Sequence, residues 1–299
     1  MGILELPWTT LMDKYVGNLI IFELLVINKW FFQIRGVALP CYCTTLLDAN
    51  GGTKCDPAKI DIIKQTSATI YAAGVDSTNA LITSFILVMT LYPEIQQRAQ
   101  EEIDRVVGTQ RLPAIGDRAN LPYLECIIRE VYRWNPASPL SVPHKLSRND
   151  EYESHMIPEG TIIIPNIWCD GSLPLCPTCS HWFLSRAMCH DPEMYPGPST
   201  FSPSRFLDLS PEKNKAMDPR NFVFGFGRRI CPGQSLGENI IFLCITSVLA
   251  CFNIRKKVVG GIEVIPTIDY PHFVGRPQPF DCEVSLRSPE AAALVLVND

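Results

Sequence analysis

The sequence predicts a mainly α-helical fold with a minor β-sheet. One long segment and several shorter ones have apolar residues at helical spacing, proline and glycine mark the ends of these segments, and strand-like stretches are few. With 299 residues, 46% of them hydrophobic, the chain is long and apolar enough to form a sizeable core.

Two helices are predicted in the first part of the chain. The longer one spans Pro57–Tyr92, with Asp56 as the expected N-cap and a proline at the first helical position. Pro93 ends that run, because proline lacks the amide hydrogen that a continuing helix needs. The second helix, Pro93–Val107, is amphipathic and charged, and Gly108 is expected to end it.

Two more helices and one strand are predicted further along the chain. The third helix spans Leu121–Trp134 and stops before Pro136. The run Thr161–Pro165 contains three consecutive isoleucines and is a short strand signal. The final helix is expected to begin just after Cys231 and to continue through Val248.

Charge and cysteine content narrow the classes of protein and partner. The formal net charge is −5, which gives no indication of a nucleic-acid partner. The 12 cysteines are scattered and no signal peptide opens the chain, which favours reduced thiols in a protein that faces the cytosol. The apolar run Leu19–Ile27 contains Glu23 and is shorter than the roughly 20 residues that span a bilayer.

One cysteine lies in the stretch FVFGFGRRICPG, which spans Phe222–Gly233. A cysteine thiolate is a strong ligand for iron, and haem iron accepts it as an axial ligand. A backbone that passes close to a porphyrin face needs small residues, which Gly225 and Gly227 provide. The haem propionates need a cation, and Arg229 lies two residues before Cys231.

The residues on either side of Cys231 fit the same interpretation. A helix that begins at Pro232–Gly233 directs its positive dipole toward the sulfur and favours the thiolate. An aromatic side chain such as Phe224 shields the sulfur from water. The alternative is a buried free cysteine in a glycine-rich loop.

The spacing Phe224-x-x-Gly227-x-Arg229-x-Cys231-x-Gly233 resembles the haem-binding loop of the cytochrome P450 family, the haem-thiolate monooxygenases. The resemblance implies the C-terminal portion of the cytochrome P450 fold and haem b (iron protoporphyrin IX) as cofactor, with Cys231 as axial ligand of the iron. It also implies that His144 contacts a propionate. The residues expected to bind the cofactor are Cys231, Arg229, His144, Phe224, Gly227 and Gly233.

A second stretch, Ala73–Thr78 in the long predicted helix, resembles the family's oxygen-activation motif. The resemblance implies catalytic roles for Asp76 as the acid and Ser77 as the hydroxyl, which pass protons to bound dioxygen, with Thr78 as a second hydroxyl. Family members more often have threonine where Ser77 stands. The alternative is a helix defect in which these side chains bond back to carbonyl groups.

Glu130 and Arg133 match the family's Glu-x-x-Arg motif, and residues three apart share one face of a helix. Arg205 resembles the third member of that buried structural network, although Ser204 stands where the family usually has glutamate. The alternative is an exposed helix pair worth about 0–1 kcal/mol.

The resemblance runs from about Gly36 to about Arg287 and is strongest to fungal microsomal members, including those similar to O-methylsterigmatocystin oxidoreductases. It predicts an irregular segment over 1–35 and a haem-binding core over 36–299 with an insert at 169–186. The family implies the cytosolic face of the endoplasmic reticulum membrane, and no anchor is identified in this chain. The family's N-terminal portion, with much of its substrate pocket, is not recognised.

Two segments have no counterpart in the family and are interpreted as translated introns, because their ends can encode splice signals: 16–33 and 169–186. The alternative for the second is a zinc site, since paired cysteines at short spacing are common zinc ligands. Its candidate ligands are Cys169, Cys176, Cys179, His181, Cys189 and His190.

The resemblance implies a haem-dependent monooxygenase that inserts one atom of dioxygen into a small apolar organic substrate. The electrons come from NADPH–cytochrome P450 reductase. One alternative is a catalytically inactive, truncated fragment of such an enzyme. Another is a metal-binding or membrane-associated interaction protein built on the two inserts.

Overall fold

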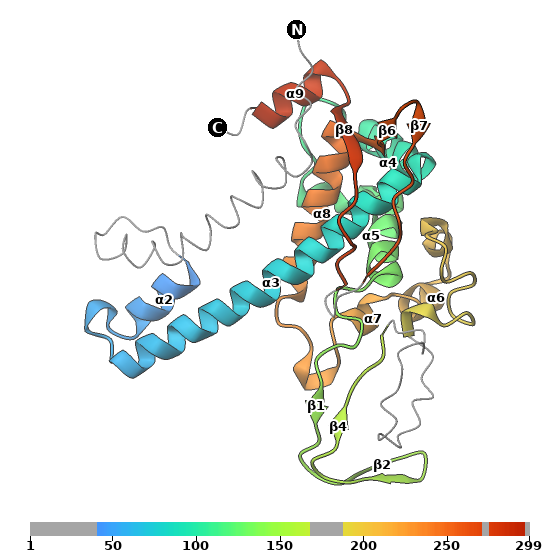
Figure 1. Ribbon diagram of the computed structural model, residues 1–299. Helices are drawn as coiled ribbons and strands as arrows, with labels where there is room; N and C mark the ends of the chain where they lie inside the picture. Colours follow the sequence, from blue (N-terminus) through green and yellow to red (C-terminus); the bar gives the residue numbers. More distant parts are fainter. Residues whose placement is uncertain (1–40, 168–187, 271–274, 297–299) are drawn as a thin grey trace. The chain divides into compact units, whose positions relative to one another are not determined.

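The computed structural model of the protein (Figure 1) describes residues 41–167, 188–270 and 275–296. It divides into two compact units, Met1–Asp76 and Ser77–Asp299, and the boundary between them falls inside one long helix. Each unit is described by itself.

Several sequence predictions lie outside the described residues. These are the irregular segment 1–35 with its proposed intron 16–33, and the insert 169–186. Four of the candidate zinc ligands fall in that insert: Cys169, Cys176, Cys179 and His181.

In the first unit, helix α2 (Tyr42–Ala49) and the 3-10 turn η1 (Gly52–Lys54) precede the start of the long helix α3 (Pro57–Leu91). Asp56 caps α3 as predicted, because its Oδ1 accepts a hydrogen bond from the Ala58 amide at 2.9 Å. The predicted helix over 57–92 is therefore confirmed, and it ends one residue earlier than expected.

The second unit contains the end of α3 and the other three predicted helices. These are α4 (Pro93–Val106), α5 (Pro122–Trp134) and α8 (Gln234–Cys251), each within three residues of its predicted ends. Shorter helical segments connect them: η2 (Ile115–Asn120), η3 (Met188–His190), η4 (Pro203–Phe206), α6 (Pro211–Ala216), α7 (Arg220–Val223) and η5 (Gly227–Arg229). The prediction that α8 is the final helix was wrong, because α9 (Pro289–Leu296) follows it.

The minor β structure of the described residues consists of separate two-stranded antiparallel pairs. The strand signal at 161–165 is confirmed as β4 (Ile162–Ile163), which pairs with β1 (His144–Lys145). The other pairs are β2 (Asp150–Tyr152) with β3 (His155–Ile157), β5 (Phe252–Lys256) with β8 (Cys282–Leu286), and β6 (Val258–Val259) with β7 (Ile262–Glu263).

The core of the second unit lies where α4, α5 and α8 pack against one another (Figure 1). Helix α5 contributes Leu124, Ile127 and Ile128, and α8 contributes Phe242 and Ile245, all with 0% exposed surface. Their burial at helical spacing is the hydrophobic contribution that holds the three helices together.

Two polar side chains of α4 join neighbouring elements to this core. Gln96 pairs with the backbone of Ile254 in β5: its Nε2 donates to the carbonyl at 2.9 Å and its Oε1 accepts from the amide at 2.8 Å. The carboxylate of Glu102 accepts hydrogen bonds from the first amides of α5, Tyr123 and Leu124, at 3.1 and 2.9 Å. An acidic group at this helix N-terminus is also favoured by the helix dipole.

Helices α3 and α8 are the described helices that could cross a membrane by length and composition alone. Each has an 18-residue window of mean hydropathy 1.4, of which 44% in α3 and 33% in α8 is buried within the protein. Because core helices of soluble proteins have the same properties, these two helices are weak indicators of a membrane span.

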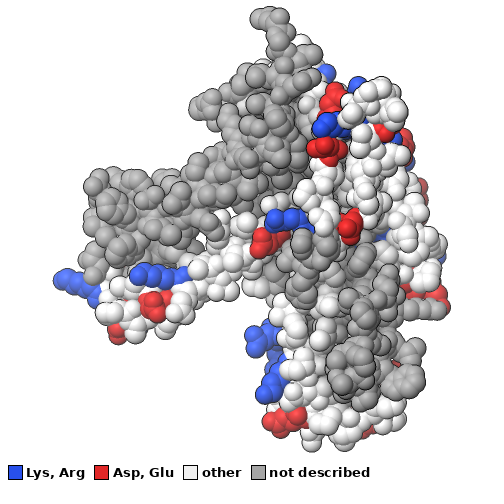
Figure 2. All heavy atoms as spheres, viewed as in Figure 1, with Lys and Arg blue, Asp and Glu red and all other residues white. Residues whose placement is uncertain are grey.

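Figure 2 shows that charged side chains of the described residues on this face form small groups, with both signs present. No single-sign patch covers the part of the face that is drawn in red, blue and white.

Candidate functional site

The Cys231 loop, residues 224–233, connects α7 to α8 and turns back on itself. The Cys231 amide donates a hydrogen bond to the carbonyl of Phe224 at 2.7 Å, across the loop. Within it, the turn η5 is closed by a bond from the Ile230 amide to the carbonyl of Gly227 at 3.2 Å. The cysteine is thus held by its own backbone beside the residue that ends α7.

Glycine is needed at the bend of the Cys231 loop. Gly225 and Gly227 have φ values of +80° and +55°, in the left-handed region that L side chains rarely adopt. A Cβ at Gly225 would lie 3.6 Å from the carbonyl oxygen of Arg229, an ordinary contact, so the backbone conformation and not lack of space requires glycine there. At Gly233 a Cβ would lie 3.8 Å from the Cys231 Sγ, so this glycine lies next to the sulfur.

The surroundings of Cys231 fit a flat, apolar ligand. Cys231 is exposed in the structure, unlike the buried free cysteine of the alternative interpretation. The same loop and the first turns of α8 expose large apolar side chains: Phe226 (36%), Ile230 (48%), Leu236 (65%) and Ile240 (37%). Helix α8 starts at Gln234 with Gly233 as N-cap, so its positive end lies next to the cysteine. Exposed apolar groups beside a soft ligand atom are what a haem face would cover.

Arg229 and His144 remain available for an anionic partner. Arg229 is exposed at the end of η5, and His144 is half-buried on β1, where it pairs with Ile163. In the part of the chain that the structure describes, neither side chain has a hydrogen bond or an ion pair. Both can therefore bind a carboxylate without first breaking a contact, as a propionate ligand requires.

The ring of Phe224 packs against α5. It meets the Tyr132 ring edge-on, with the ring centroids 5.4 Å apart. Tyr132 is only 2% exposed, and burial raises the pKa of its phenol well above the ordinary value. Its hydroxyl has no hydrogen-bond partner among the described residues. Phe224, which is predicted to shield the sulfur, is therefore held in place by its contact with α5.

Glu130, Arg133 and Arg205 form one network in the interior. Arg133 donates to both carboxylate oxygens of Glu130 at 2.8 Å, and neither side chain has exposed surface. Arg205, on η4, donates through Nε to the same carboxylate at 3.0 Å. The Ser202 amide adds a bond at 2.8 Å. The alternative of an exposed helix pair does not hold.

The arginines of this network also hold backbone segments that lack regular structure. Arg133 Nη1 donates to the carbonyl of Cys189 at 2.9 Å, and Arg205 Nη1 donates to that of Pro196 at 2.8 Å. Both guanidinium groups also donate to the carbonyl of Thr200, at 3.4 and 3.0 Å. The network therefore fixes the segment from 189 to 206 on α5, a structural role rather than a chemical one.

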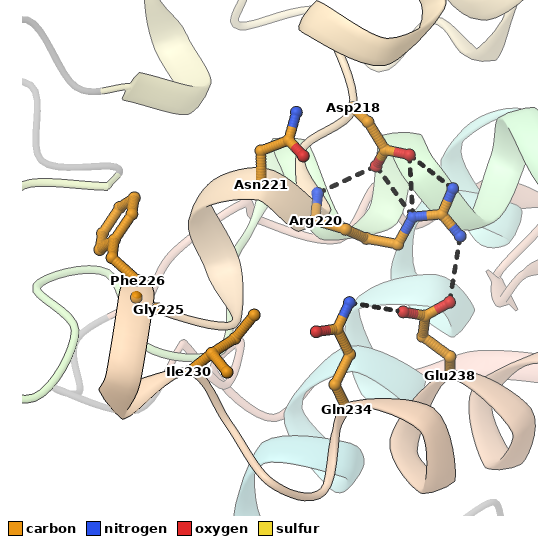
Figure 3. A pocket seen from close by; sticks show the side chains of 9 residues that line it. Asp218, Arg220, Asn221, Gly225, Phe226, Ile230, Gln234 and Glu238 are labelled. Carbon is orange, nitrogen blue, oxygen red and sulfur yellow. Dashed lines mark hydrogen bonds and ion pairs between the residues drawn. The ribbon is translucent and has the colours of Figure 1, made fainter.

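A second ionic network lies beside the Cys231 loop and has no counterpart among the sequence predictions (Figure 3). Arg220 on α7 donates to Asp218 at 2.5–3.0 Å, to Glu125 on α5 at 2.8 Å and to Glu238 on α8 at 3.1 Å. Burial alone would raise the pKa of Asp218, but the bonds from Arg220 outweigh it and the pKa is lowered. The whole network is Arg118, Glu125, Arg129, Asp218, Arg220 and Glu238.

A cavity of about 450 Å3 separates this network from the Cys231 loop. Asp218, Arg220 and Glu238 line one side of it, and Gly225, Phe226 and other loop residues line the other, as Figure 3 shows. A weak sequence signal for the network exists in Asp218-Pro-Arg220, since an acid two residues before an arginine can pair locally. No local sequence pattern predicts that Arg220 pairs with residues of α5 or α8.

The residues predicted for proton transfer lie on α3. Asp76 is exposed, and Ser77 and Thr78 are half-buried. The helix assignment is continuous across them, so these residues do not interrupt α3. Asp76 ends the first unit and Ser77 begins the second.

The zinc alternative receives no support from the described residues. Cys189 is fully buried, and burial raises the pKa of its thiol to about 12, which disfavours the thiolate that zinc needs. Among the residues that the structure describes, no three metal-binding side chains come together.

Comparison with known proteins places the chain in a family. A family model described as Cytochrome P450 matches residues 43–171 and 182–282, which is most of the chain. The chain belongs to the cytochrome P450 family. Haem is the expected cofactor of this family of haem-thiolate proteins.

Fungal relatives and solved structures agree with this assignment. The chain is 44% identical over 235 residues to cytochrome P450 monooxygenase 176 of Postia placenta, covering 78% of this chain and 42% of the relative. It is 37% identical over 267 residues to cytochrome P450 monooxygenase claR of Ampulloclitocybe clavipes, covering 88% of this chain and 45% of the relative. The chain therefore spans less than half the length of these relatives.

A zebrafish cytochrome P450, solved with abiraterone, has the same fold over much of the chain. The TM-score is 0.66 at 26% sequence identity, and the match covers 82% of this chain and 53% of the zebrafish protein. The predicted fold class, the C-terminal portion of the cytochrome P450 fold, is thereby confirmed.

Proposed function

We propose that the chain is the haem-binding portion of a monooxygenase that inserts one atom of dioxygen into a small apolar organic substrate. The observation that carries this proposal is the Cys231 loop. It holds an exposed thiol beside the N-terminus of α8, between glycines that leave the sulfur accessible. The monooxygenase names of the fungal relatives support the reaction class.

In this proposal the Sγ of Cys231 would hold the haem iron, and bound haem would supply the oxygen-activating chemistry. The Arg229 guanidinium and the His144 imidazole hold the propionates. Gly227 and Gly233 keep side chains away from the porphyrin face, and Phe224 limits water at the sulfur. Glu130, Arg133 and Arg205 hold the surrounding core in place.

Proton delivery is assigned to the α3 motif. The Asp76 carboxyl takes protons from solvent, as its exposure allows, and the Ser77 Oγ passes them on. Thr78 is a second hydroxyl for this step. The electrons come from NADPH–cytochrome P450 reductase. Because the family is often membrane-associated, the proposed location is the cytosolic face of the endoplasmic reticulum.

A second candidate is a catalytically inactive fragment of such an enzyme. The chain spans 42–48% of the length of the relatives compared. Such a fragment keeps the buried Glu130 network, which forms within the described residues without the Cys231 loop.

The two candidates are separated by the absorbance spectrum of the purified chain with haem, reduced and treated with carbon monoxide. A Soret band at the family's red-shifted position, lost in Cys231→Ser, supports thiolate ligation by Cys231. The same spectrum for the native chain and Cys231→Ser would overturn the haem-binding proposal and leave the inactive fragment.

The segments 16–33 and 169–186 are proposed to be translated introns. The family match breaks between residues 171 and 182, inside the second segment. Sequencing the mature transcript tests the proposal, which requires both segments to be absent from it.

A further inference from the structure

We infer that Arg220 and Glu238 are positioning residues, whose ion pair closes the base of the Cys231 loop and fixes the place of the thiol. We call this pair the clasp. Its consequence for haem binding rests on the proposed function, whereas its effect on the loop can be measured without haem.

The clasp joins the two helices from which the loop emerges. Arg220 is the first residue of α7, which leads into the loop, and Glu238 lies in the second turn of α8, which leads out of it. The Nη1 of Arg220 and the Oε2 of Glu238 are 3.1 Å apart (Figure 3). Residues 18 positions apart in sequence therefore meet where the loop starts and ends.

Each half of the clasp is held by further contacts. Asp218 receives three hydrogen bonds from the Arg220 side chain, and Gln234 donates to Glu238 at 2.9 Å. Glu125 of α5 accepts from the same Nη1 at 2.8 Å, which anchors the clasp to the core. The planar guanidinium is suited to such multiple acceptors, because its donors have a fixed fork geometry.

The environment makes the clasp stronger than a surface ion pair. The side chains of Arg220 and Glu238 are only 17% and 16% exposed, so solvent screens their attraction weakly. The network contains three cations and three anions, which balance. Removing one member leaves a partner charge uncompensated in a half-buried place, which is more damaging than losing an exposed pair.

The loop cannot hold the thiol by itself. Gly225 and Gly227 are the least restrained residue type, and Cys231 is attached across the loop by a single backbone bond to Phe224. Phe224 is the C-cap of α7, so that bond survives only if α7 and α8 keep their separation. Arg220 and Glu238 form a direct ion pair between these two helices.

The first test is hydrogen exchange at the Cys231 amide in the full, haem-free chain, with Arg220→Gln, Glu238→Gln and the double variant. Each single variant is expected to speed exchange about tenfold, with no further increase in the double variant. The Ile254 amide, which is buried and bonded to Gln96, reports general loss of stability.

The control is Arg287→Gln, which breaks an arginine–acid pair at the other end of α8, where Arg287 lies 2.6 Å from Asp104. It should leave exchange at Cys231 unchanged. Equal acceleration at Cys231 and Ile254, or none at Cys231, would overturn the clasp. If Arg220→Gln does not fold, Glu238→Gln alone decides, since it keeps the size of the side chain.

The second test is the carbon monoxide spectrum of the haem-loaded chain. The proportion of haem in the red-shifted thiolate band should fall in Arg220→Gln and Glu238→Gln, recover in part in Arg220→Lys, and stay constant in Arg287→Gln. An unchanged proportion in both clasp variants would overturn the positioning role. A native chain without the band would refute the proposed function, and the exchange data would still decide the clasp.

Discussion

Arg133 donates two hydrogen bonds of 2.8 Å to the carboxylate of Glu130, one helical turn earlier, and neither side chain has any exposed surface. Arg205 and the Ser202 amide reach the same carboxylate from a distant part of the chain. One buried anion thus has partners on α5, on η4 and in the segment before η4.

Glu130→Gln should strongly destabilise the protein. The substitution keeps the shape of the side chain but leaves two guanidinium charges with one anionic partner fewer, and breaking a buried pair costs about 3–5 kcal/mol. Urea unfolding followed by far-ultraviolet circular dichroism measures the loss. Asp281→Asn, which breaks an exposed pair with Lys257, is the control and should change stability little. Equal effects of the two variants would contradict the buried network.

Gln96→Leu should weaken the attachment of β5 to α4. It removes the side-chain amide that satisfies both backbone groups of Ile254, and a buried unsatisfied group costs about 1–3 kcal/mol. The neighbouring change Gln97→Leu removes only an exposed bond to Glu101 and serves as the control. The midpoint of thermal unfolding of Gln96→Leu should be well below that of the native chain and that of Gln97→Leu.

Gly275→Ala tests a close approach between two chain segments. A Cβ at Gly275 would lie 2.5 Å from the carbonyl oxygen of Pro136, so the backbone must shift. We expect a loss of about 1–3 kcal/mol, as for other overpacked sites. Gly116→Ala has no atom within 4 Å of its new Cβ and should be tolerated. Similar unfolding midpoints for the two variants would argue against the contact.

The ends of the main helices could be predicted because their signals are local. Asp56, Pro93 and Gly108 act on adjacent backbone, so α3 and α4 end within one residue of prediction. Strands such as β6 and β7, two residues each, carry too little pattern to recognise, and their pairing depends on chain segments that meet only in the fold.

The candidate site also combines features with a local sequence signal and features that depend on distant parts of the chain. The bend of the Cys231 loop follows from Gly225 and Gly227, and both glycines lie within a few residues of the cysteine in the sequence. The bond between Arg220 and Glu125 joins residues 95 positions apart, and no local pattern specifies it. The burial of Arg133 was also implied only by family resemblance, because a lone glutamate–arginine pair on a helix is normally exposed.

Two buried thiols should make the protein less stable in alkali. Burial raises the pKa of Cys126 from 9.0 to about 11 and that of Cys189 from 9.0 to about 12. Between the unfolded and folded pKa values the unfolded chain binds fewer protons, so stability falls as pH rises from about 9, by up to about 1.4 kcal/mol per pH unit for each thiol.

Urea unfolding at pH 8 to 11 measures this slope. Cys189→Ala should flatten it by removing one titrating group, whatever its effect on stability at pH 8. A slope that is unchanged in Cys189→Ala would contradict the assigned burial.

The hydrogen-bond partners of the Glu130 carboxylate are synthesised at different times. Arg133 leaves the ribosome three residues after the carboxylate, but Arg205 follows 75 residues later, about 4–15 s at ordinary elongation rates. Through that interval the nascent α5 carries a pair that is only partly satisfied and has no segment folded over it. A pause in translation before residue 205 lengthens this exposure, so codon speed in that stretch should influence the yield of folded protein.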